Sequence, residues 1–280
     1  MTRTHAHRAT IEAELADLYG PDVDWLRETG VVHVAAIGAR PRAALALGPA
    51  APASPTDRFV LGFARARADA IVTTGAILRA EPDLVHRASD APDEDAAWRA
   101  WRAERLARRV APECVVVSQS GQLPRAHPAL RGPGRATVVT TGAGRARLEG
   151  AALPFSVVAL EDAEVGTGPE DLLSAAIAWL RRARGAETVV VEAGPRSTVG
   201  LYLGRDGDRA ITRVDELLLS LFRGDAFEAV PGPTMPETAV LAACFGGAAS
   251  PQPRSRRGRQ EPSGAWEFER YRRGRPGEPR

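Results

Sequence analysis

Glu192 and the small residues after it form the most informative chemical pattern in the chain. The carboxylate ends the run Thr-Val-Val-Val-Glu at positions 188–192, and two small residues follow. This order predicts a buried strand, a tight turn and a helix that begins near Ser197. Ligands of open α/β sheets bind beyond the carboxyl ends of strands, so Glu192 would face a ligand. The helix start, with Gly194, Ser197 and Thr198, suits a phosphate, although an ordinary turn with a solvated carboxylate has the same pattern.

Two further turns carry weaker signals. Gly75 ends the apolar run 69–74 and is followed by charged residues, a pattern that a plain loop would also show. The turn Gly142-Ala143-Gly144 follows a second apolar run but lacks the third glycine and the acidic residue of a dinucleotide-binding fingerprint. Arg145 and Arg147 could help to bind a 2′-phosphate there, and scattered surface arginines are the alternative.

The residue types that the chain lacks disfavour several reaction classes. All 37 basic residues are arginine, so a Schiff-base lysine and the lysine of a phosphate-binding loop are excluded. Cys114 and Cys244 lie in apolar stretches without zinc-ligand spacing, and we predict no metal site. There is no Gly-x-Ser-x-Gly elbow for a hydrolase. His33 is expected to be a core or edge residue of its strand. No metal-ligand partner accompanies the other histidines, which are His5, His7, His86 and His127.

Charge and hydropathy suggest an ordinary globular protein. The net charge is +2, and the Arg-rich segment 254–259 lacks interleaved aromatic residues, so we expect no nucleic-acid partner. No apolar run approaches the length of a membrane span, and no apolar segment follows the polar N-terminus as in a secretory signal. We therefore expect a cytoplasmic protein with no membrane partner.

Apolar strands alternate with amphipathic helices through most of the chain, which indicates a parallel sheet covered on both faces. The expected strands are 31–37, 69–75, 115–118, 136–141, 156–160, 188–192 and 214–221. The expected helices are 10–19, 54–67, 93–109, 169–184 and 197–203.

The C-terminal part has a different pattern. Segments 240–245 and 266–271 are expected to pair as an antiparallel edge, with the Pro- and Arg-rich segment 250–264 as an exposed loop between them. We expect a helical N-terminal extension over residues 1–30, a single domain over 31–271 and a disordered tail over 272–280.

The order of the motifs resembles the reductase domain of the bifunctional riboflavin-biosynthesis deaminase–reductase. That family has a helix ending in Leu-Arg-Ala-x-x-Asp-Ala, an apolar strand, and then Gly-Ala-Gly-Thr-Val-Arg-Ala-Asp-x-Pro-x-Leu. Residues 64–84 here read Ala-Arg-Ala-Arg-Ala-Asp-Ala-Ile-Val-Thr-Thr-Gly-Ala-Ile-Leu-Arg-Ala-Glu-Pro-Asp-Leu. The family motifs Val-Val-Leu-Ser, Val-Glu-Gly-Gly-Pro and Val-Asp-Glu are matched at 115–118, 191–195 and 214–216.

The resemblance implies an α/β, dihydrofolate-reductase-like three-layer fold, with a mostly parallel central sheet and an antiparallel C-terminal edge. It implies NADPH as hydride donor and a substrate such as 5-amino-6-(5-phosphoribosylamino)uracil, reduced at the ribose C1′. It places Glu192 at the catalytic position, and Arg65, Leu84 and Glu192 at substrate-contacting positions. The implied cofactor positions are Ile77, Glu81, Gly194, Pro195, Arg196, Ser197, Thr198, Val199 and Gly200. A homodimer is also implied, with the strands at 214–221 and 266–271 as candidate surfaces.

Some positions depart from the family pattern. Ile77 replaces a threonine, Glu81 an aspartate and Ala193 a glycine, and Ile37-Gly38-Ala39-Arg40 replaces a Ser-x-Asp-Gly turn. The zinc signature of a deaminase half is absent, which implies a reductase without that half. The departures leave two alternatives open: a non-catalytic nucleotide-binding or dimerisation protein of the same fold, and a reductase of another pterin or pyrimidine.

Overall fold

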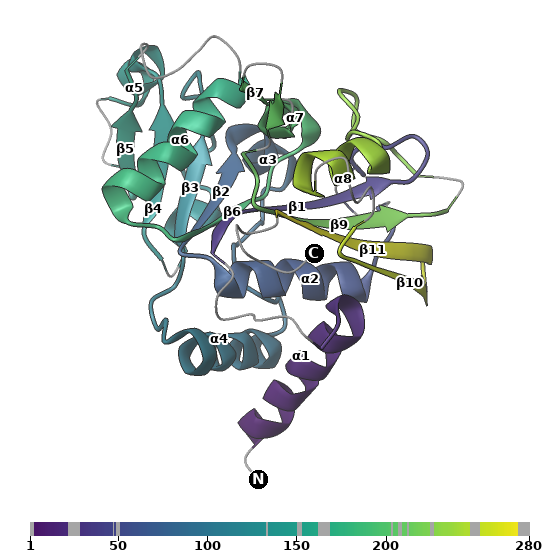
Figure 1. Ribbon diagram of the computed structural model, residues 1–280. Helices are drawn as coiled ribbons and strands as arrows, with labels where there is room; N and C mark the ends of the chain where they lie inside the picture. The colour runs from purple at the N-terminus through teal and green to yellow at the C-terminus, as the bar shows by residue number, and fades with distance from the viewer. Residues whose placement is uncertain are drawn as a thin grey trace. The chain divides into compact units, whose positions relative to one another are not determined.

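The computed structural model describes residues 3–21, 29–46, 48, 51–132, 134–149, 153–161, 169–202, 204–206, 209–211, 213–224, 227–246 and 253–273. The chain divides into two compact units, whose helices and strands are labelled in Figure 1. Leu61–Ala193 make one, here called the central unit, and Met1–Val60 with Gly194–Arg280 make the other, here called the terminal unit.

The central unit is a parallel α/β sheet with the strand order β6-β2-β3-β4-β5. Its strands are β2 (Ala70–Thr74), β3 (Glu113–Val117), β4 (Ala136–Thr140), β5 (Ser156–Ala159) and β6 (Thr188–Val191). Its helices are the second half of α2 (Pro55–Arg67), α3 (Gly75–Ala80), α4 (Pro92–Leu106), η1 (Pro128–Arg131), α5 (Gly142–Leu148) and α6 (Pro169–Arg184).

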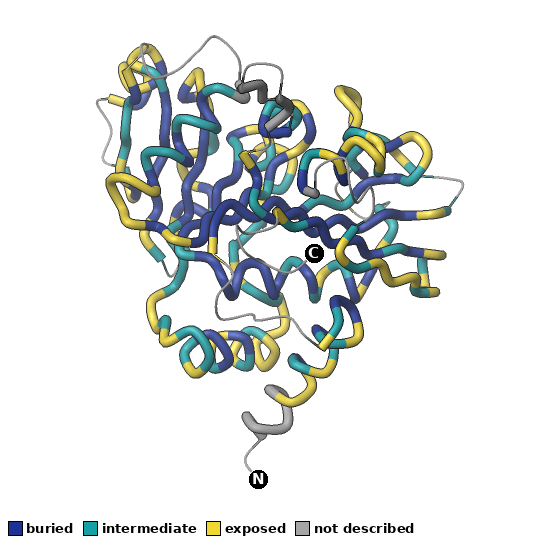
Figure 2. Tube along the Cα trace, viewed as in Figure 1, coloured by how far each residue is buried: buried dark blue, intermediate teal, exposed yellow. Residues whose placement is uncertain are grey.

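The apolar strands lie inside the central unit because helices cover them. Figure 2 shows these strands as buried and the outer side of α4 as exposed. In Figure 1, α6 runs in front of the strands and contacts β3. Phe63 of α2 packs edge-on against Trp101 of α4, and Trp98 packs against both rings. The aromatic stripe of α4 is therefore the surface that fixes this helix on α2.

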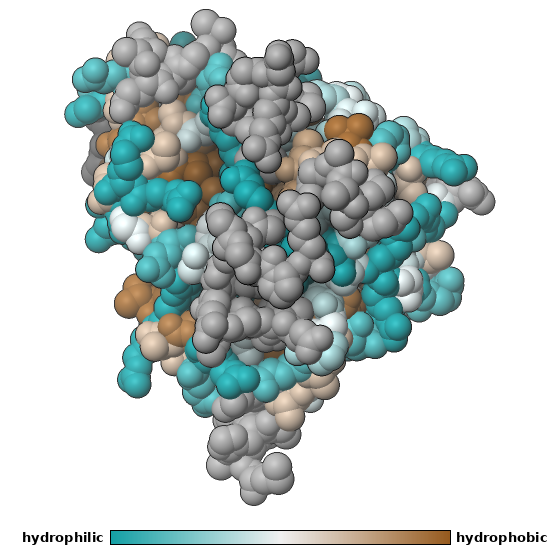
Figure 3. Space-filling view, in the orientation of Figure 1, coloured by the Kyte–Doolittle hydropathy of each residue, from teal (hydrophilic) through white to brown (hydrophobic). Residues whose placement is uncertain are grey.

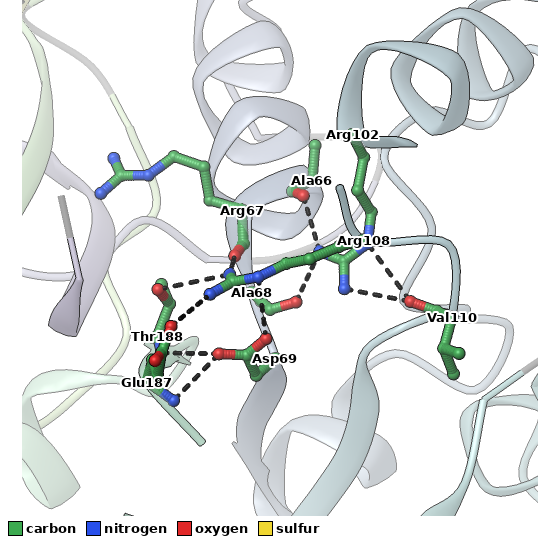
Figure 4. A network of polar contacts seen from close by, with 9 residues as sticks. All are labelled: Ala66, Arg67, Ala68, Asp69, Arg102, Arg108, Val110, Glu187 and Thr188. Carbon is green, nitrogen blue, oxygen red and sulfur yellow. Dashed lines mark hydrogen bonds and ion pairs between the residues drawn. The ribbon is translucent and has the colours of Figure 1, made fainter. Parts of the chain in front are cut away.

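An arginine network closes the connection between α2 and β2 (Figure 4). Nη1 of Arg102 donates to the carbonyls of Ala66 and Ala68, at 2.8 and 2.7 Å, and the same guanidinium donates to the carbonyl of Val110. Asp69 accepts from the backbone N–H groups of Glu187 and Thr188, each at 2.9 Å. These contacts tie the start of β2 to the start of β6, which fixes the end of α2 in the unit.

The terminal unit has a mixed sheet with the order β10-β11-β9-β1. Strand β1 runs parallel to β9, with Val34 beside Leu218, whereas β11 is antiparallel to both β9 and β10. The strands of the unit are β1 (Gly30–Gly38), β7 (Gly204–Asp206), β8 (Arg209–Ile211), β9 (Glu216–Phe222), β10 (Ser255–Glu261) and β11 (Gly264–Arg272). Its helices are α1 (Arg3–Tyr19), the first half of α2, α7 (Pro195–Tyr202) and α8 (Thr238–Gly246).

Helix α1 is held on the outer strand β10 by ion pairs. Arg259 pairs with Glu14 and Asp17, each at 2.5 Å, and Arg257 pairs with Asp17 at the same distance. Figure 3 shows hydrophilic side chains over β10 and β11 on the face in view. Charged side chains on an outer strand oppose pairing with another chain, so the arginines serve both purposes.

The predicted fold class is confirmed: an α/β protein whose sheet strands are parallel except at the C-terminal edge. Helix 169–184 matches its prediction, and the strands agree within about two residues at each end. Short helices α3 and α5 follow β2 and β4, where only turns were expected. Within the described residues, no helix combines the length and hydropathy that a membrane span requires.

Two predictions for the C-terminal part are wrong. Residues 240–245 form part of α8, because an Ala-rich apolar run has no period that separates helix from strand, and alanine favours the helix. The expected loop 250–264 contains β10, which makes a hairpin with β11 through Pro262 and Ser263. Gly264 has a φ of +132°, which only glycine adopts without strain. The disordered tail expected over 272–280 begins too early, because Arg272 ends β11 and the N–H of Arg273 donates to the carbonyl of Asp215. The rest of that tail, residues 274–280, lies outside the described residues.

The two strands expected to form a dimer surface are not at an edge of the sheet. Strand β9 is paired on one side with β1 and on the other with β11, and β11 is itself paired with β10. Neither strand therefore offers a free edge, and β10 is the outer strand of this sheet.

Candidate active site

Arg65 and Glu192 form a buried two-pronged ion pair. Arg65 lies in the last turns of α2, and Glu192 directly follows β6, where its N–H donates to the carbonyl of Val72 on β2. Nε of Arg65 donates to Oε1 of Glu192 at 2.8 Å, and Nη2 donates to Oε2 at 2.7 Å. Each side chain is 10% exposed. The parallel strands thus place the carboxylate, and the helix places its partner.

Both members of the pair, Arg65 and Glu192, carry their charges. Burial alone would raise the pKa of Glu192, but the charge and hydrogen bonds of Arg65 outweigh it and hold the pKa below its ordinary value. Burial opposes the charge on Arg65 as well, yet Glu192 raises the pKa of the guanidinium. Glu192 is therefore an anionic hydrogen-bond acceptor at neutral pH and is not a proton donor.

His86 and Cys114 stand beside this pair. Nε2 of His86 lies 3.7 Å from Oε2 of Glu192, and the imidazole side chain is 4% exposed. Nδ1 of His86 lies 3.5 Å from Sγ of Cys114 on β3. Burial lowers the pKa of His86 to about 4 and raises that of Cys114 to about 12, so the imidazole is neutral and the thiol is protonated.

The segment after β2 carries the other residues expected near the ligand. Thr74 caps α3 by accepting from the N–H of Ile77 at 3.3 Å, and the N–H of Glu81 donates back to the carbonyl of Ile77 at 2.8 Å. The N–H of Leu84 donates to the carbonyl of Glu81 at 3.1 Å, which sets the turn that leads to His86. Burial raises the pKa of Glu81, whereas Arg65 opposes that rise.

The turn that begins α7 belongs to the terminal unit. The N–H of Ser197 and the hydroxyl of Thr198 both donate to the carbonyl of Gly194, at 3.0 and 3.3 Å. Gly194 and Arg196 are exposed, and no described atom lies within 4 Å of the place that a Cβ on Gly194 would take. No described side chain therefore crowds the backbone at Gly194, which a phosphate site at a helix start would require.

The Gly142-Ala143-Gly144 turn has a packing role. A Cβ on Gly144 would overlap the hydroxyl of Thr140 and would lie 2.7 Å from the carbonyl oxygen of Gln119. Arg147 donates to the carbonyl of Ser120 at 2.8 Å. Close packing between the loops after β3 and β4 thus explains Gly144, and exposed arginines lie on the surface next to these loops.

Comparisons with known proteins bear on the fold. A crystal structure of a pyrimidine reductase-like protein from Corynebacterium diphtheriae matches with a TM-score of 0.57 and 20% identity, over 94% of this chain and 99% of that one. RibD from Acinetobacter baumannii matches with a TM-score of 0.53 and 16% identity, over 88% of this chain and 58% of RibD. Riboflavin biosynthesis reductase Rib7 from Saccharomyces cerevisiae matches with a TM-score of 0.50 and 12% identity, over 94% and 99%.

The chain has the pyrimidine-reductase fold. The resemblance that the motifs indicated is confirmed at the level of this fold. No family model matches the sequence, and no curated protein matches it. The motifs were therefore recognisable by order and spacing although overall identity to the solved structures is low.

Within the pyrimidine-reductase fold, one subset of the expected site residues is brought together. Arg65 and Glu192 are in direct contact, and Glu81 and Leu84 share the turn that leads to their neighbour His86. The residues from Gly194 to Gly200 lie in the terminal unit and form the start of α7.

Sequence reasoning missed His86 and Cys114 as neighbours of the pair. The only available signal for His86 was its position two residues after Leu84, where the motif ends. Cys114 lies near Glu192 because β3, β2 and β6 are adjacent, and His86 lies there because Arg65 holds its segment through the carbonyl of Arg87. No local sequence pattern encodes either contact. The described residues contain no group of His, Cys, Asp and Glu able to hold a metal ion.

Proposed function

We propose that this protein is an NADPH-dependent reductase of a phosphorylated ribosylamino-pyrimidine, with hydride transfer to the ribose C1′. The observation that carries the proposal is the buried Arg65–Glu192 pair at the carboxyl end of a parallel sheet. The fold supports it, since the similar solved structures are described as pyrimidine or riboflavin-biosynthesis reductases.

Glu192 would bind the substrate as an acceptor. Its carboxylate is anionic and held at both oxygens, so the lone pairs that Arg65 leaves free can accept from ribose hydroxyl or amino groups of the substrate. Arg65 would orient the carboxylate and offset its negative charge next to a phosphorylated ligand. Leu84, which is half-buried, would supply an apolar contact to the pyrimidine ring.

The residues at the start of α7 fit a dinucleotide phosphate. Gly194 leaves space beside the backbone, and the exposed guanidinium of Arg196 provides donors and charge. The proposed cofactor-contacting set is Ile77, Glu81 and Gly194 to Gly200. When bound, NADPH supplies the hydride, whereas the chain orients the reactants and excludes water.

A direct assay tests the proposal. Purified protein is mixed with NADPH and 5-amino-6-(5-phosphoribosylamino)uracil, and NADPH consumption and the ribityl product are measured. We expect turnover in the wild type, a loss of about 100-fold or more in Glu192→Gln, and no change in Glu94→Gln, an exposed carboxylate on α4.

The alternatives have distinct outcomes in the same experiment. If neither a thermal shift nor a fluorescence titration detects NADPH at millimolar concentration, the reductase proposal is wrong and a non-catalytic protein of this fold is favoured. If NADPH binds without turnover of this pyrimidine, this pyrimidine is not the substrate, and a reductase of another pyrimidine or pterin is favoured. Ile77 and Ala193, which replace a family threonine and glycine, are the residues that favour these alternatives.

A further inference from the structure

We propose that His86 is a positioning residue for Glu192, held by Cys114 as the tautomer that carries its proton on Nε2. The inference rests on the proposed function for its catalytic consequence, but the tautomer itself can be measured without turnover. It assigns a role to two side chains that the motif resemblance does not include.

The ring nitrogen Nε2 of His86 makes no hydrogen bond within the described residues. This atom is buried and has no hydrogen-bond partner among the described residues, although it points at Oε2 of Glu192 from 3.7 Å. A buried ring nitrogen without a partner is costly, and its cost is least when the nearest group complements it. The nearest group is an anion, and an N–H is attracted to it whereas a bare lone pair is repelled.

The other ring nitrogen of His86, Nδ1, faces Cys114. Nδ1 lies 3.5 Å from Sγ of Cys114, whose thiol is protonated. A thiol is a donor, so Nδ1 is best used as the acceptor of S–H. Both ends of the imidazole therefore favour one arrangement, with S–H pointing to Nδ1 and Nε2–H pointing to the carboxylate.

The charges around the ring agree with a neutral imidazole. The groups that face it are Glu192 after β6, Arg65 on α2, Cys114 on β3 and His127 before η1. Arg65 and His127 oppose a second positive charge, and Arg65 already neutralises Glu192. His127 is itself engaged, because Nδ1 accepts from the N–H of Ala129 while Nε2 lies 2.7 Å from the carbonyl of Glu81.

The consequence concerns the orientation of Glu192. Arg65 holds both oxygens of the carboxylate, and Nε2–H of His86 faces Oε2 from a separate segment of the chain. Two independent contacts restrict rotation of the carboxylate more than one does, which fixes the lone pairs that remain for the substrate. His86 thus acts on the substrate through Glu192.

The tautomer is tested by ¹⁵N–¹H correlation spectroscopy of histidine side chains in the full-length protein, with His86→Gln used for assignment. We expect wild-type His86 to be neutral and protonated on Nε2 at neutral pH. In Cys114→Ala the second tautomer should become populated, whereas Cys114→Ser, which retains a hydroxyl donor, should keep the wild-type pattern. An Nδ1–H imidazole in the wild type, or an unchanged tautomer in Cys114→Ala, would overturn the proposal.

A kinetic comparison tests the consequence. His86→Gln retains an N–H near the position of Nε2 and should stay within about threefold of wild-type kcat/KM, whereas His86→Leu should lose about tenfold or more. Equal losses in the two variants would contradict a positioning role. The spectroscopic result stands even if the pyrimidine proves not to be the substrate, so failure of this inference and failure of the proposed function are distinguishable.

Discussion

Arg65 holds both carboxylate oxygens of Glu192, at 2.8 and 2.7 Å, across 127 residues of sequence. The same guanidinium donates through Nη1 to the carbonyl of Arg87 at 2.9 Å. A single side chain therefore connects α2, the end of β6 and the segment that carries His86. This makes Arg65 the organising residue of the candidate site, and several measurable consequences follow from it and its surroundings.

Removing one partner of the pair should destabilise the protein. Arg65→Leu leaves the Glu192 carboxylate buried without its counterion, so we expect the free energy of unfolding to fall by about 3–5 kcal/mol in urea denaturation at neutral pH. Arg65→Lys should retain only part of the stability that the pair contributes, because an ammonium group cannot make both contacts. A loss below about 1 kcal/mol in Arg65→Leu would show that the pair contributes little.

The stability of the protein should fall in mild acid because of His86. Its pKa in the folded protein is lowered from 6.5 to about 4, so only the unfolded chain takes up a proton between these values. The free energy of unfolding should therefore decrease as the pH falls from 6.5 towards 4, by roughly 3 kcal/mol. Glu192, with its lowered pKa, adds a loss in the same direction at lower pH. The measurement compares wild type with His86→Gln across this range, and parallel curves would contradict the prediction.

Arg102 should matter for folding and not for the chemistry. It donates to the carbonyls of Ala66, Ala68 and Val110 (Figure 4). Because Arg102→Leu would leave these carbonyls without this donor, we expect the free energy of unfolding to fall by about 3 kcal/mol. The control is Arg99→Ala on the same helix, where the side chain is 70% exposed and pairs with Asp95 in the preceding turn. That variant should stay within about 0.5 kcal/mol of wild type in chemical denaturation. Comparable losses in both variants would argue against the network.

The attachment of α1 should depend on salt. Arg259→Leu removes the contacts to Glu14 and Asp17, and hydrogen exchange of the α1 amides should accelerate. High salt should have the same effect on the wild type. Arg256→Leu, on the same strand but paired with Glu267 and Glu269, is the matched control and should leave α1 exchange unchanged. Salt-independent protection would mean that apolar contacts alone hold the helix.

Exposed arginines after β4 should determine the preference between the two nicotinamide cofactors. If Arg145 contacts the 2′-phosphate of NADPH, Arg145→Gln should raise the KM for NADPH about tenfold and leave the KM for NADH unchanged. Arg145 is mostly exposed and pairs only loosely with Glu149, at 3.6 Å, so the substitution should not affect folding. Equal effects on both cofactors would remove Arg145 from the site.

The sequence by itself determined the alternation of buried strands and amphipathic helices, because that information is local. The apolar run before Glu192 and the small residues after it specify a strand and a turn wherever they lie. The order of the motifs also indicated the reductase fold, since spacing survives when identity is low. The Ala-rich run in α8 and the arginine-rich run in β10 were misassigned, because their structure depends on the partners they pack against.

Only the tertiary structure decided which side chains meet. Cys114 becomes a neighbour of Glu192 because parallel strands β3, β2 and β6 lie side by side. His86 becomes one because Arg65 also donates to the carbonyl of Arg87, in the segment that carries the imidazole. Their burial then sets their protonation, since the charged form of each loses its solvation. Sequence patterns specify the elements, whereas contacts between distant elements, and the electrostatics that follow from them, are fixed only when the chain is folded.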